Sequence, residues 1–410
     1  MEKSLIAAFR SMLTMHRWNL HPRVETWVEA ENAALVAHWA YVIANTKNKK
    51  IKDVDIAHVL FRTLLTSLTK HFMTDISFFV TQNLKKKHNK TWVEIVNKNA
   101  KDTAKLFPRE IIEIISGYLT DEGNYENKDY PVSSKIDKKK KDEIEGIIRF
   151  CQRKVAYQEC HTNSIVYKDI YANIIQSFKV ELGEGSPSEY DKAKGLKPIL
   201  PKKTLEEYNQ IMKDKTYDEY FQAIARLKYI RRWNTMSRFT PSSVLAHTYI
   251  VTVLALMFSL SEGDQPNWNK FVRTSLLTAL FHDVPEAMTG DIITPVKNMF
   301  NEKEEGVMEN VETDLRESFT KSIPGSITSE ISPLLIDINN EKPGSESSLV
   351  KDCDRLALML ECFYEKESKV KNPEMERTYQ KNYQELSNSE WSSVRQFLSV
   401  LSDHWLNCGD

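Results

Sequence analysis

The chain has 410 residues, of which 41% are hydrophobic and 10% aromatic, so it is longer than one core usually supports and can form two packed domains. A formal net charge of −1 creates no global field, so neither nucleic acid nor a membrane is expected as a partner. Five cysteines without zinc spacing, and an N-terminus unlike a signal peptide, favour a reducing, cytoplasmic location. The longest apolar stretch, 249–260, is too short to span a bilayer.

Four segments of the first half recur in the second half in the same order, with a period of about 200 residues. Their pairs are MHRWNL and IRRWNT, ALVAHWAYV around His38 and SVLAHTYIV around His247, FRTLLTSLTKH and VRTSLLTALFHD, and IIRFCQRKVAYQEC and LVKDCDRLALMLEC. A repeat of this length predicts two homologous domains rather than a solenoid.

We place these domains at residues 1–182 and 204–410. The Gly-, Pro-, Ser- and Lys-rich segment 183–203 is interpreted as the linker. In each half a polar segment precedes the last repeated motif, and the Lys-rich stretch 133–143 within the first of them is interpreted as a solvated loop.

Helical periodicity predicts an all-α fold. Apolar residues recur at spacings of three and four in the stretch 272–281, and the same holds for the stretch 349–360. The chain has only 12 glycines and no clear alternating strand pattern.

Two histidines and two aspartates in apolar, helix-like stretches form a candidate metal site. These residues are His247, His282, Asp283 and Asp354. Imidazoles suit transition metals and carboxylates suit harder ions, so the set predicts one divalent ion, with Mn, Co, Zn, Mg and Fe as candidates. Four protein ligands on an octahedral ion leave positions for water and substrate, as a catalytic site needs.

The first half has lost these ligands. In register, Lys70 stands opposite His282, His71 opposite Asp283, and Gln152 opposite Asp354, while His38 alone keeps a ligand. Since an ammonium group and an amide cannot replace an imidazole and a carboxylate around a divalent cation, we expect the first domain to be metal-free.

Asp352 is also acidic, but the repeat and the motif both assign the ligand position to Asp354. Asp352 points elsewhere on a helix, and we interpret it as a solvated residue or a salt-bridge partner.

Residues 220–365 resemble the HD-domain metal phosphohydrolases, most closely the bacterial 5′-deoxynucleotidases. The resemblance is carried by RLKYIRRWNTM, by His247, by FHDVPEAMTGDIITPVK and by LVKDCDRLALML. It implies a helical HD domain in the second half, which the internal repeat extends to a homologous HD-like domain in the first half, and it identifies the four residues above as metal ligands. It also implies that Glu286 and Asp291 are catalytic carboxylates and that Arg232 and Trp233 contact the substrate.

One departure concerns the residues before His247: the family usually has a Ser-Glu pair where this chain has Leu245 and Ala246. This difference bears on how the substrate is selected.

Phosphate ester hydrolysis requires charge neutralisation and an activated water, and a bound divalent ion supplies both. Arg232 can hold a phosphate through its planar guanidinium, and Glu286 can accept a proton from the water or orient it. Asp291 can protonate the leaving oxygen, orient it or bind the sugar, and the sequence leaves these alternatives open. Thr289 and Lys297 are secondary candidates for phosphate contacts.

The leading hypothesis is a metal-dependent nucleotide 5′-phosphohydrolase that acts on deoxyribonucleoside 5′-monophosphates. The alternatives are a dNTP triphosphohydrolase, a cyclic or oligonucleotide phosphodiesterase, and a non-catalytic nucleotide sensor or scaffold. Because family members commonly form homodimers, the first domain is expected to supply the partner surface of an intramolecular pseudo-dimer, with further homo-oligomerisation left open. A nucleotide-binding, regulatory role is the alternative for that domain.

Overall fold

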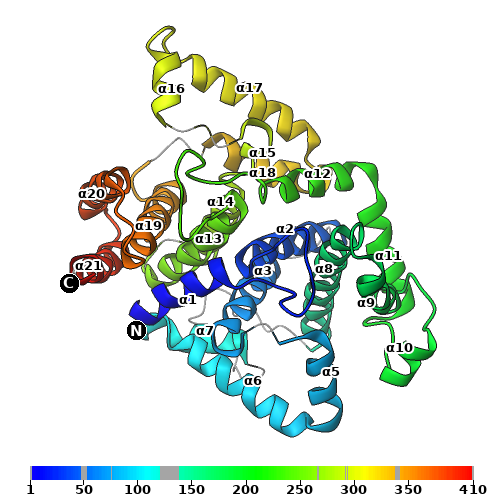
Figure 1. Cartoon of the computed structure of the whole chain (residues 1–410). Helices are drawn as coiled ribbons and strands as arrows, with labels where there is room; N and C mark the ends of the chain where they lie inside the picture. Colours follow the sequence, from blue (N-terminus) through cyan, green and yellow to red (C-terminus); the bar gives the residue numbers. More distant parts are fainter. Residues whose placement is uncertain are drawn as a thin grey trace.

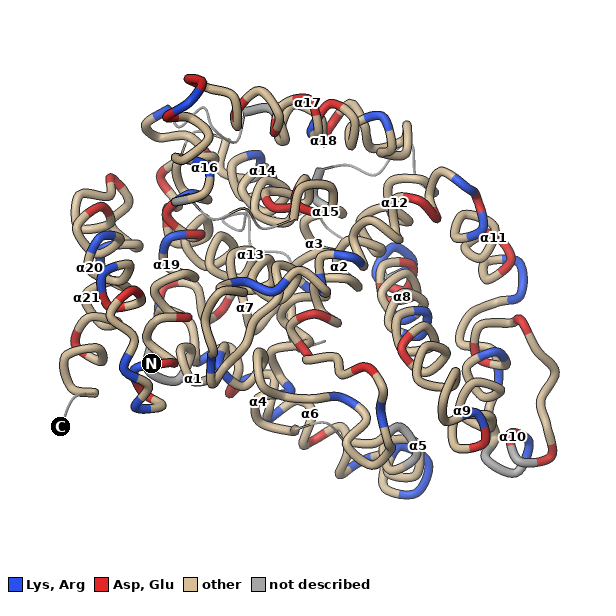
Figure 2. The backbone as a smooth tube through the Cα atoms, turned by 45° about the horizontal axis from the view of Figure 1, so that its top comes forward, with Lys and Arg blue, Asp and Glu red and all other residues tan. Residues whose placement is uncertain are grey.

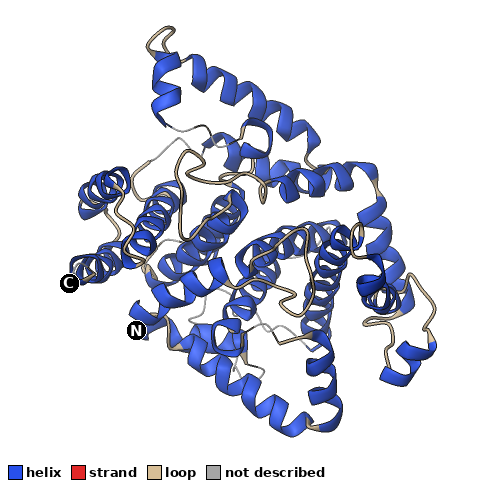
Figure 3. Cartoon of the chain, viewed as in Figure 1, coloured by secondary structure: helices blue, strands red, loops and turns tan. Residues whose placement is uncertain are grey.

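The computed structural model describes residues 2–47, 53–74, 76–120, 138–265, 267–290, 292, 294–337 and 342–408. Within these ranges the chain is helical and has no strand, and the only extended pairings are the isolated bridges His16–Val28 and Arg231–Ser243 (Figure 3). The prediction of an all-α fold is confirmed.

The helices are distributed along the whole chain (Figure 1). Those of the first half are α1 (Glu2–Thr14), α2 (Glu29–Lys47), α3 (Asp53–Leu68), α4 (Lys70–Met73), α5 (Phe78–Lys87), α6 (Asn89–Ala104), the 3₁₀-helix η1 (Arg109–Ile111), α7 (Ile112–Leu119), α8 (Lys138–Ser164) and α9 (Lys168–Glu181). Those that follow are α10 (Glu189–Lys194), α11 (Lys202–Lys213), α12 (Lys215–Arg226), α13 (Val244–Ser261), α14 (Trp268–Phe281), α15 (Glu286–Thr289), α16 (Thr294–Asn301), α17 (Val307–Ser322), α18 (Gly325–Asp337), α19 (Glu346–Glu367), α20 (Pro373–Ser387) and α21 (Ser392–Asn407).

Helix α13 lies at the centre of the molecule because it is apolar on all sides. Every residue from Val244 to Leu260 is buried, and α13 packs against α14 and α19 of its own half and against α2 of the first half (Figure 1). By length and composition α13 could cross a membrane, and it is longer than the apolar stretch seen in the sequence. However, 94% of it is buried inside the protein, so α13 is a core helix.

The two halves share one hydrophobic core and several buried polar contacts. The hydroxyl of Tyr249 donates to the carbonyl oxygen of Leu64 (3.1 Å), and Ser243 donates to a carboxylate oxygen of Glu31 (2.8 Å). Near the chain termini, the Tyr364 hydroxyl donates to the carbonyl oxygen of Ile6 (2.8 Å). The surface carries both signs of charge across the helices, as the small net charge implies (Figure 2).

Two segments interpreted as loops contain helix. The segment 183–203 includes α10, which has a complete capping box at Ser188, and Leu200 packs against the α8 backbone at Gly146. The domain bounds remain predictions, because nothing beyond this packing tests them. The Lys-rich stretch begins outside the described residues, but residues 138–143 form the first turns of α8 rather than a solvated loop.

The two halves share an unusual local geometry before their central helices. Trp18 and Trp233 have positive φ angles of 58° and 57°, and an isolated bridge closes each loop just before α2 and α13 begin. Counted from these helix starts, the residue equivalent to His247 is Asn32. The sequence match of His38 to His247 is therefore wrong: His38 lies further along α2, where its buried ring packs edge-on against Phe281 (centroids 5.0 Å apart).

Candidate metal centre

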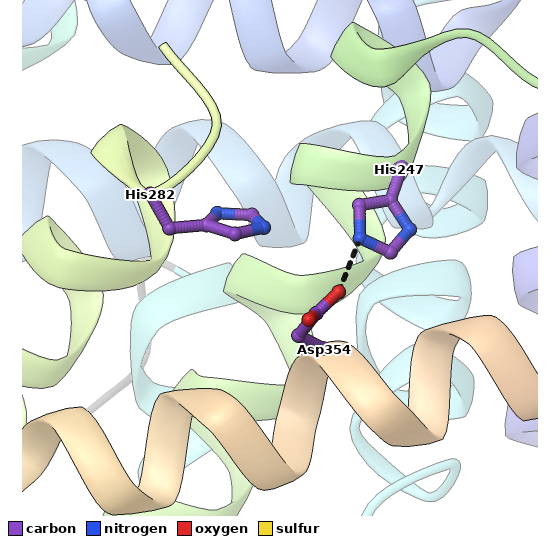
Figure 4. A group of neighbouring side chains, drawn as sticks. All are labelled: His247, His282 and Asp354. Atoms are coloured by element: carbon purple, nitrogen blue, oxygen red, sulfur yellow. Dashed lines mark hydrogen bonds and ion pairs between the residues drawn. The ribbon is translucent and has the colours of Figure 1, made fainter. Parts of the chain in front are cut away.

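The four predicted ligands come from three helices of the second half. His247 lies in the first turn of α13, which Ser243 caps by accepting from the amide of Ala246 (3.2 Å). His282 directly follows α14 and Asp283 comes next, while Asp354 lies on the third turn of α19. Because α13 packs against both α14 and α19, the side chains of His247, His282 and Asp354 meet (Figure 4).

The donor atoms converge on one small volume. His247, His282 and Asp354 each present one potential ligand atom, and all of these atoms lie within 4.8 Å of one another. Nε2 of His247 lies 2.9 Å from Oδ1 of Asp354 and 3.9 Å from Oδ2 of Asp283, and Nε2 of His282 lies 3.1 Å from the same Asp283 oxygen. The structure thus brings together all four residues singled out in the sequence.

Backbone and carboxylate contacts orient both imidazoles. Nδ1 of His282 lies 2.7 Å from the carbonyl oxygen of Ala279, so it carries the proton and leaves the lone pair of Nε2 directed at the centre. Nδ1 of His247 faces Oε1 of Glu361 at 3.5 Å. Both histidines therefore offer Nε2, the arrangement found when a second partner orients a metal-ligating histidine.

The electrostatics of the centre favour a cation. Burial and the nearby Arg232 lower the pKa of His247, but hydrogen bonds to Asp354 and Glu361 outweigh them and raise it to about 9. Burial opposes ionisation of Asp354, yet its hydrogen bond to His247 and the charges of both histidines hold its pKa below the usual range. Without a metal ion, the raised pKa of His247 shows that the carboxylates around it attract positive charge.

Glu361 is a buried residue that sequence reasoning missed. Besides facing His247, its carboxylate accepts from the indole nitrogen of Trp233 (2.7 Å) and from the Ser242 hydroxyl (3.0 Å), and it lies 3.3 Å from Nε of Arg232. A signal was present: both copies of the last repeated motif end in Glu-Cys, and the first-half counterpart Glu159 pairs with Arg17 at 2.9 Å.

A cavity of about 280 Å³, here called the C-terminal cavity, opens over the centre. Its walls contain most of the remaining predicted site residues, namely Arg232, Glu286, Thr289 and Lys297, together with the ligand candidates His282, Asp283 and Asp354. Arg316 on α17 and Lys351 on α19 also line it and were not identified from the sequence. Lys297 is paired with Glu312 (2.6 Å), another residue of the wall.

Three residues singled out in the sequence are not among the described residues of the cavity wall. Trp233 is not among the residues that line the C-terminal cavity, and its indole nitrogen bonds Glu361. Asp291 lies outside the described residues. Asp352 is buried rather than solvated. The expected salt bridge is present, because Nη1 of Arg355 lies 3.1 Å from Oδ1 of Asp352. The Ser389 hydroxyl also donates a hydrogen bond of 2.5 Å to Asp352.

The donor set suits a divalent ion. Two neutral imidazoles and two carboxylates are common ligands of first-row transition metals. Nε2 of His282 and Oδ2 of Asp283 are buried and lie 3.1 Å apart, and neither makes a hydrogen bond to a described residue outside the centre, so both atoms are available to a ligand. Within the part of the chain that is described, these residues form the one cluster of this kind.

Known proteins resemble the half of the chain that contains this centre. Residues 219–405 match the family model described as "5′-deoxynucleotidase YfbR-like". The 5′-deoxynucleotidase of Erwinia tasmaniensis is 27% identical over 149 residues (36% of this chain, 74% of the relative), and 5′-deoxynucleotidase YfbR of Escherichia coli is 28% identical over 146 residues (36% and 72%). The crystal structure of an HD-domain phosphohydrolase from Listeria innocua is similar over 46% of this chain and 89% of its own length, at 24% identity and with a TM-score of 0.39.

The family match spans α12 to α21, and it therefore includes all four ligand candidates and the walls of the C-terminal cavity. Over residues 219–405 this chain is therefore similar to the YfbR-like 5′-deoxynucleotidases, and the protein is a hydrolase.

Proposed function

We propose that the protein hydrolyses deoxyribonucleoside 5′-monophosphates to deoxynucleoside and phosphate, using one divalent ion held by His247, His282, Asp283 and Asp354. The observation that carries the proposal is the convergence of the imidazole nitrogens of His247 and His282 with the carboxylates of Asp354 and Asp283, beside a cavity that also holds cationic side chains. The named activity of the relatives, 5′-deoxynucleotidase, supports the choice of substrate.

The C-terminal cavity supports a nucleotide with a single phosphate. Arg232, Lys297, Arg316 and Lys351 place four cationic side chains around it, and a guanidinium binds phosphate oxygens in a planar, two-pronged manner. At about 280 Å³ the cavity is at the small end of ligand pockets, which favours a monophosphate over a triphosphate.

The residues of the cavity divide the chemistry between them. A bound divalent ion would neutralise phosphate charge and lower the pKa of water. The guanidinium of Arg232 lies between the carboxylates of Asp283 (3.8 Å) and Glu361 (3.3 Å). These two contacts orient the guanidinium before the phosphate binds. Glu286 accepts the proton of the attacking water. From the family resemblance alone, Asp291 protonates or orients the leaving 5′-oxygen or binds the sugar.

Trp233 acts here as a positioning residue rather than a substrate contact. Its indole, together with Ser242, fixes the Glu361 carboxylate, which in turn faces Nδ1 of His247 and Nε of Arg232. One buried carboxylate thereby orients a metal ligand and a phosphate-binding group at the same time.

We also propose that the two halves are homologous domains forming an intramolecular pseudo-dimer. The packing of α2 on α13 and of α3 on α14 supports this, as do the matching geometries at Trp18 and Trp233. Without the first half, α13 and Tyr249 would lose a large buried contact. Residues 204–410 expressed alone should therefore aggregate or self-associate, and a stable, fully active monomer of this fragment contradicts the proposal.

Product analysis tests the proposed reaction. Full-length protein is incubated with ribo- and deoxynucleoside mono- and triphosphates and with cyclic nucleotides in Mn²⁺, Co²⁺, Zn²⁺, Fe²⁺ or Mg²⁺, with an EDTA control. We expect metal-dependent phosphate from deoxyribonucleoside monophosphates. Release of triphosphate, opening of a cyclic nucleotide, or binding without turnover would instead identify one of the alternative functions.

A further inference from the structure

A second cavity, of about 400 Å³, lies in the first half of the chain and is here called the N-terminal cavity. Its walls include Arg17, Trp18, Asn32, Lys70, Lys85, Arg149, Gln152 and Arg153. They come from the loop before α2, from α2, α4, α5 and α8, and the volume is within the range of small-molecule pockets.

The N-terminal cavity occupies the position that corresponds to the C-terminal cavity. In the first half, Nε of Arg17 lies 2.9 Å from the Glu159 carboxylate. In the second half, Nε of Arg232 lies 3.3 Å from the Glu361 carboxylate in the same way. Lys70 and Gln152, which the sequence aligns with His282 and Asp354, line it as their counterparts line the other cavity. The space over the lost metal centre has therefore stayed open.

The chemistry at the bottom of this cavity excludes a divalent ion but keeps positive charge. Asn32 stands where His247 stands in the second half, and Gln152 offers an amide in place of a carboxylate. Lys70 supplies an ammonium group and pairs with Glu29 at 2.7 Å. The ammonium group of Lys70 thus supplies the positive charge that a divalent ion would supply in the second half, so an anion can bind here. Without a metal ion, no activated water is available to attack that anion.

The charges of the described residues leave a surplus that matches one phosphate group. Arg17 and Lys70 pair with Glu29, Arg17 also pairs with Glu159, and Arg153 pairs with Glu181. Lys85 and Arg149, at the mouth, have no carboxylate within salt-bridge distance among the described residues. Desolvation and the charge of Arg153 lower the pKa of Lys85, as expected where cations gather without full compensation.

The walls also offer groups for the rest of a nucleotide. Trp18 and His21, whose ring centroids are 6.0 Å apart, supply aromatic side chains to the wall against which a base can pack. Asn32 lines the cavity and is 5% exposed. Its Oδ1 atom is buried and has no hydrogen-bond partner among the described residues. Such an acceptor suits a hydroxyl or amino donor of a ligand.

We propose that the N-terminal cavity binds a nucleoside phosphate without a metal ion and without hydrolysing it. The phosphate lies against Lys85, Arg149 and Arg153, and the nucleoside lies against Trp18 and His21. The second half would then hydrolyse nucleotides while the first half binds one. This inference does not depend on the proposed reaction, because binding here requires no turnover.

Calorimetric titration of the full-length Asp354→Asn variant in EDTA tests this site with the metal centre disabled. The titrants are dAMP, AMP, deoxyadenosine and inorganic phosphate. We expect one mononucleotide to bind per chain, and to bind more tightly than either phosphate or deoxyadenosine alone. No nucleotide binding, or phosphate binding as tightly as dAMP, overturns the proposal.

Further variants in the same background locate the binding. Lys85→Ala with Arg149→Ala removes two exposed cations of the mouth and should lower nucleotide affinity ~10-fold or more, since each charge-assisted contact is substantial. Lys87→Ala, on the exposed end of the same helix α5, and Arg232→Ala, in the C-terminal cavity, should leave the affinity unchanged. An affinity that falls in Arg232→Ala and not in the double variant assigns the binding to the C-terminal cavity and refutes the proposal.

Discussion

The buried carboxylate of Glu361 allows a sharp test of how the centre is organised. Glu361→Gln keeps the size of the side chain but removes the charge that faces Nδ1 of His247 and Nε of Arg232. Substitution of such a supporting partner typically lowers metal affinity 10–100-fold, or about 1.4–2.8 kcal/mol. We expect a loss of this size, because the amide can no longer hold His247 as a basic ligand.

Stability provides a second readout of the same change. Glu361 accepts hydrogen bonds from Trp233 and Ser242 and lies 3.5 Å from Nη1 of Arg238, whose side chain is 3% exposed. Because Glu365 remains 3.5 Å from Nε of Arg238, the arginine keeps one carboxylate. The free energy of unfolding in EDTA should therefore fall by about 1–3 kcal/mol, the usual cost of weakening buried, charge-assisted hydrogen bonds.

The first half supplies a matched control in Glu159→Gln. Glu159 is equally buried and pairs with Arg17, but no ligand candidate is near it. Metal titration by calorimetry, and thermal unfolding with and without metal, should show a similar loss of stability in both variants and a loss of metal affinity in Glu361→Gln alone. Unchanged metal affinity in Glu361→Gln, or an equal loss in Glu159→Gln, would refute the reasoning.

Three further predictions concern the ligands, the proton acceptor and the contact between halves. Asp354→Asn should abolish both metal retention and phosphate release while circular dichroism shows an intact helical fold; full activity would remove Asp354 from the site. Glu286→Ala should bind metal and nucleotide but turn over at least ~100-fold more slowly, and an unchanged kcat would reassign Glu286 to structure. Tyr249→Phe, which removes the hydrogen bond to Leu64, should lower the free energy of unfolding by about 1 kcal/mol in denaturant titrations without changing kcat, and a loss of activity alone would contradict this.

Sequence patterns were sufficient to predict those features of the fold and of the site that depend on residue spacing or residue type. The apolar spacing predicted a helical protein, and the ligand candidates were recognisable because two imidazoles and two carboxylates occur in buried helical stretches. They were not sufficient where backbone geometry sets the register. His38 matched His247 by local similarity, whereas the loop at Trp18 and the start of α2 place Asn32 there.

Residues that act through other residues, or that come from distant segments, were also missed. Glu361 carries no family motif, and its importance appears only when Trp233, Arg232 and His247 are seen to share one carboxylate. Arg316 belongs to α17, whose path over the cavity no local pattern determines. The Lys-rich stretch at the start of α8 has good helix formers, and that propensity outweighs its charge.

The central claim is that one half of the chain holds a catalytic ion and the other half holds none. Elemental analysis of metal-loaded protein, combined with phosphate release from dAMP, tests it most directly. The account predicts one divalent ion per wild-type chain with metal-dependent release of phosphate, and neither ion nor release in Asp354→Asn. Two ions per chain, or an ion retained in Asp354→Asn, would contradict it.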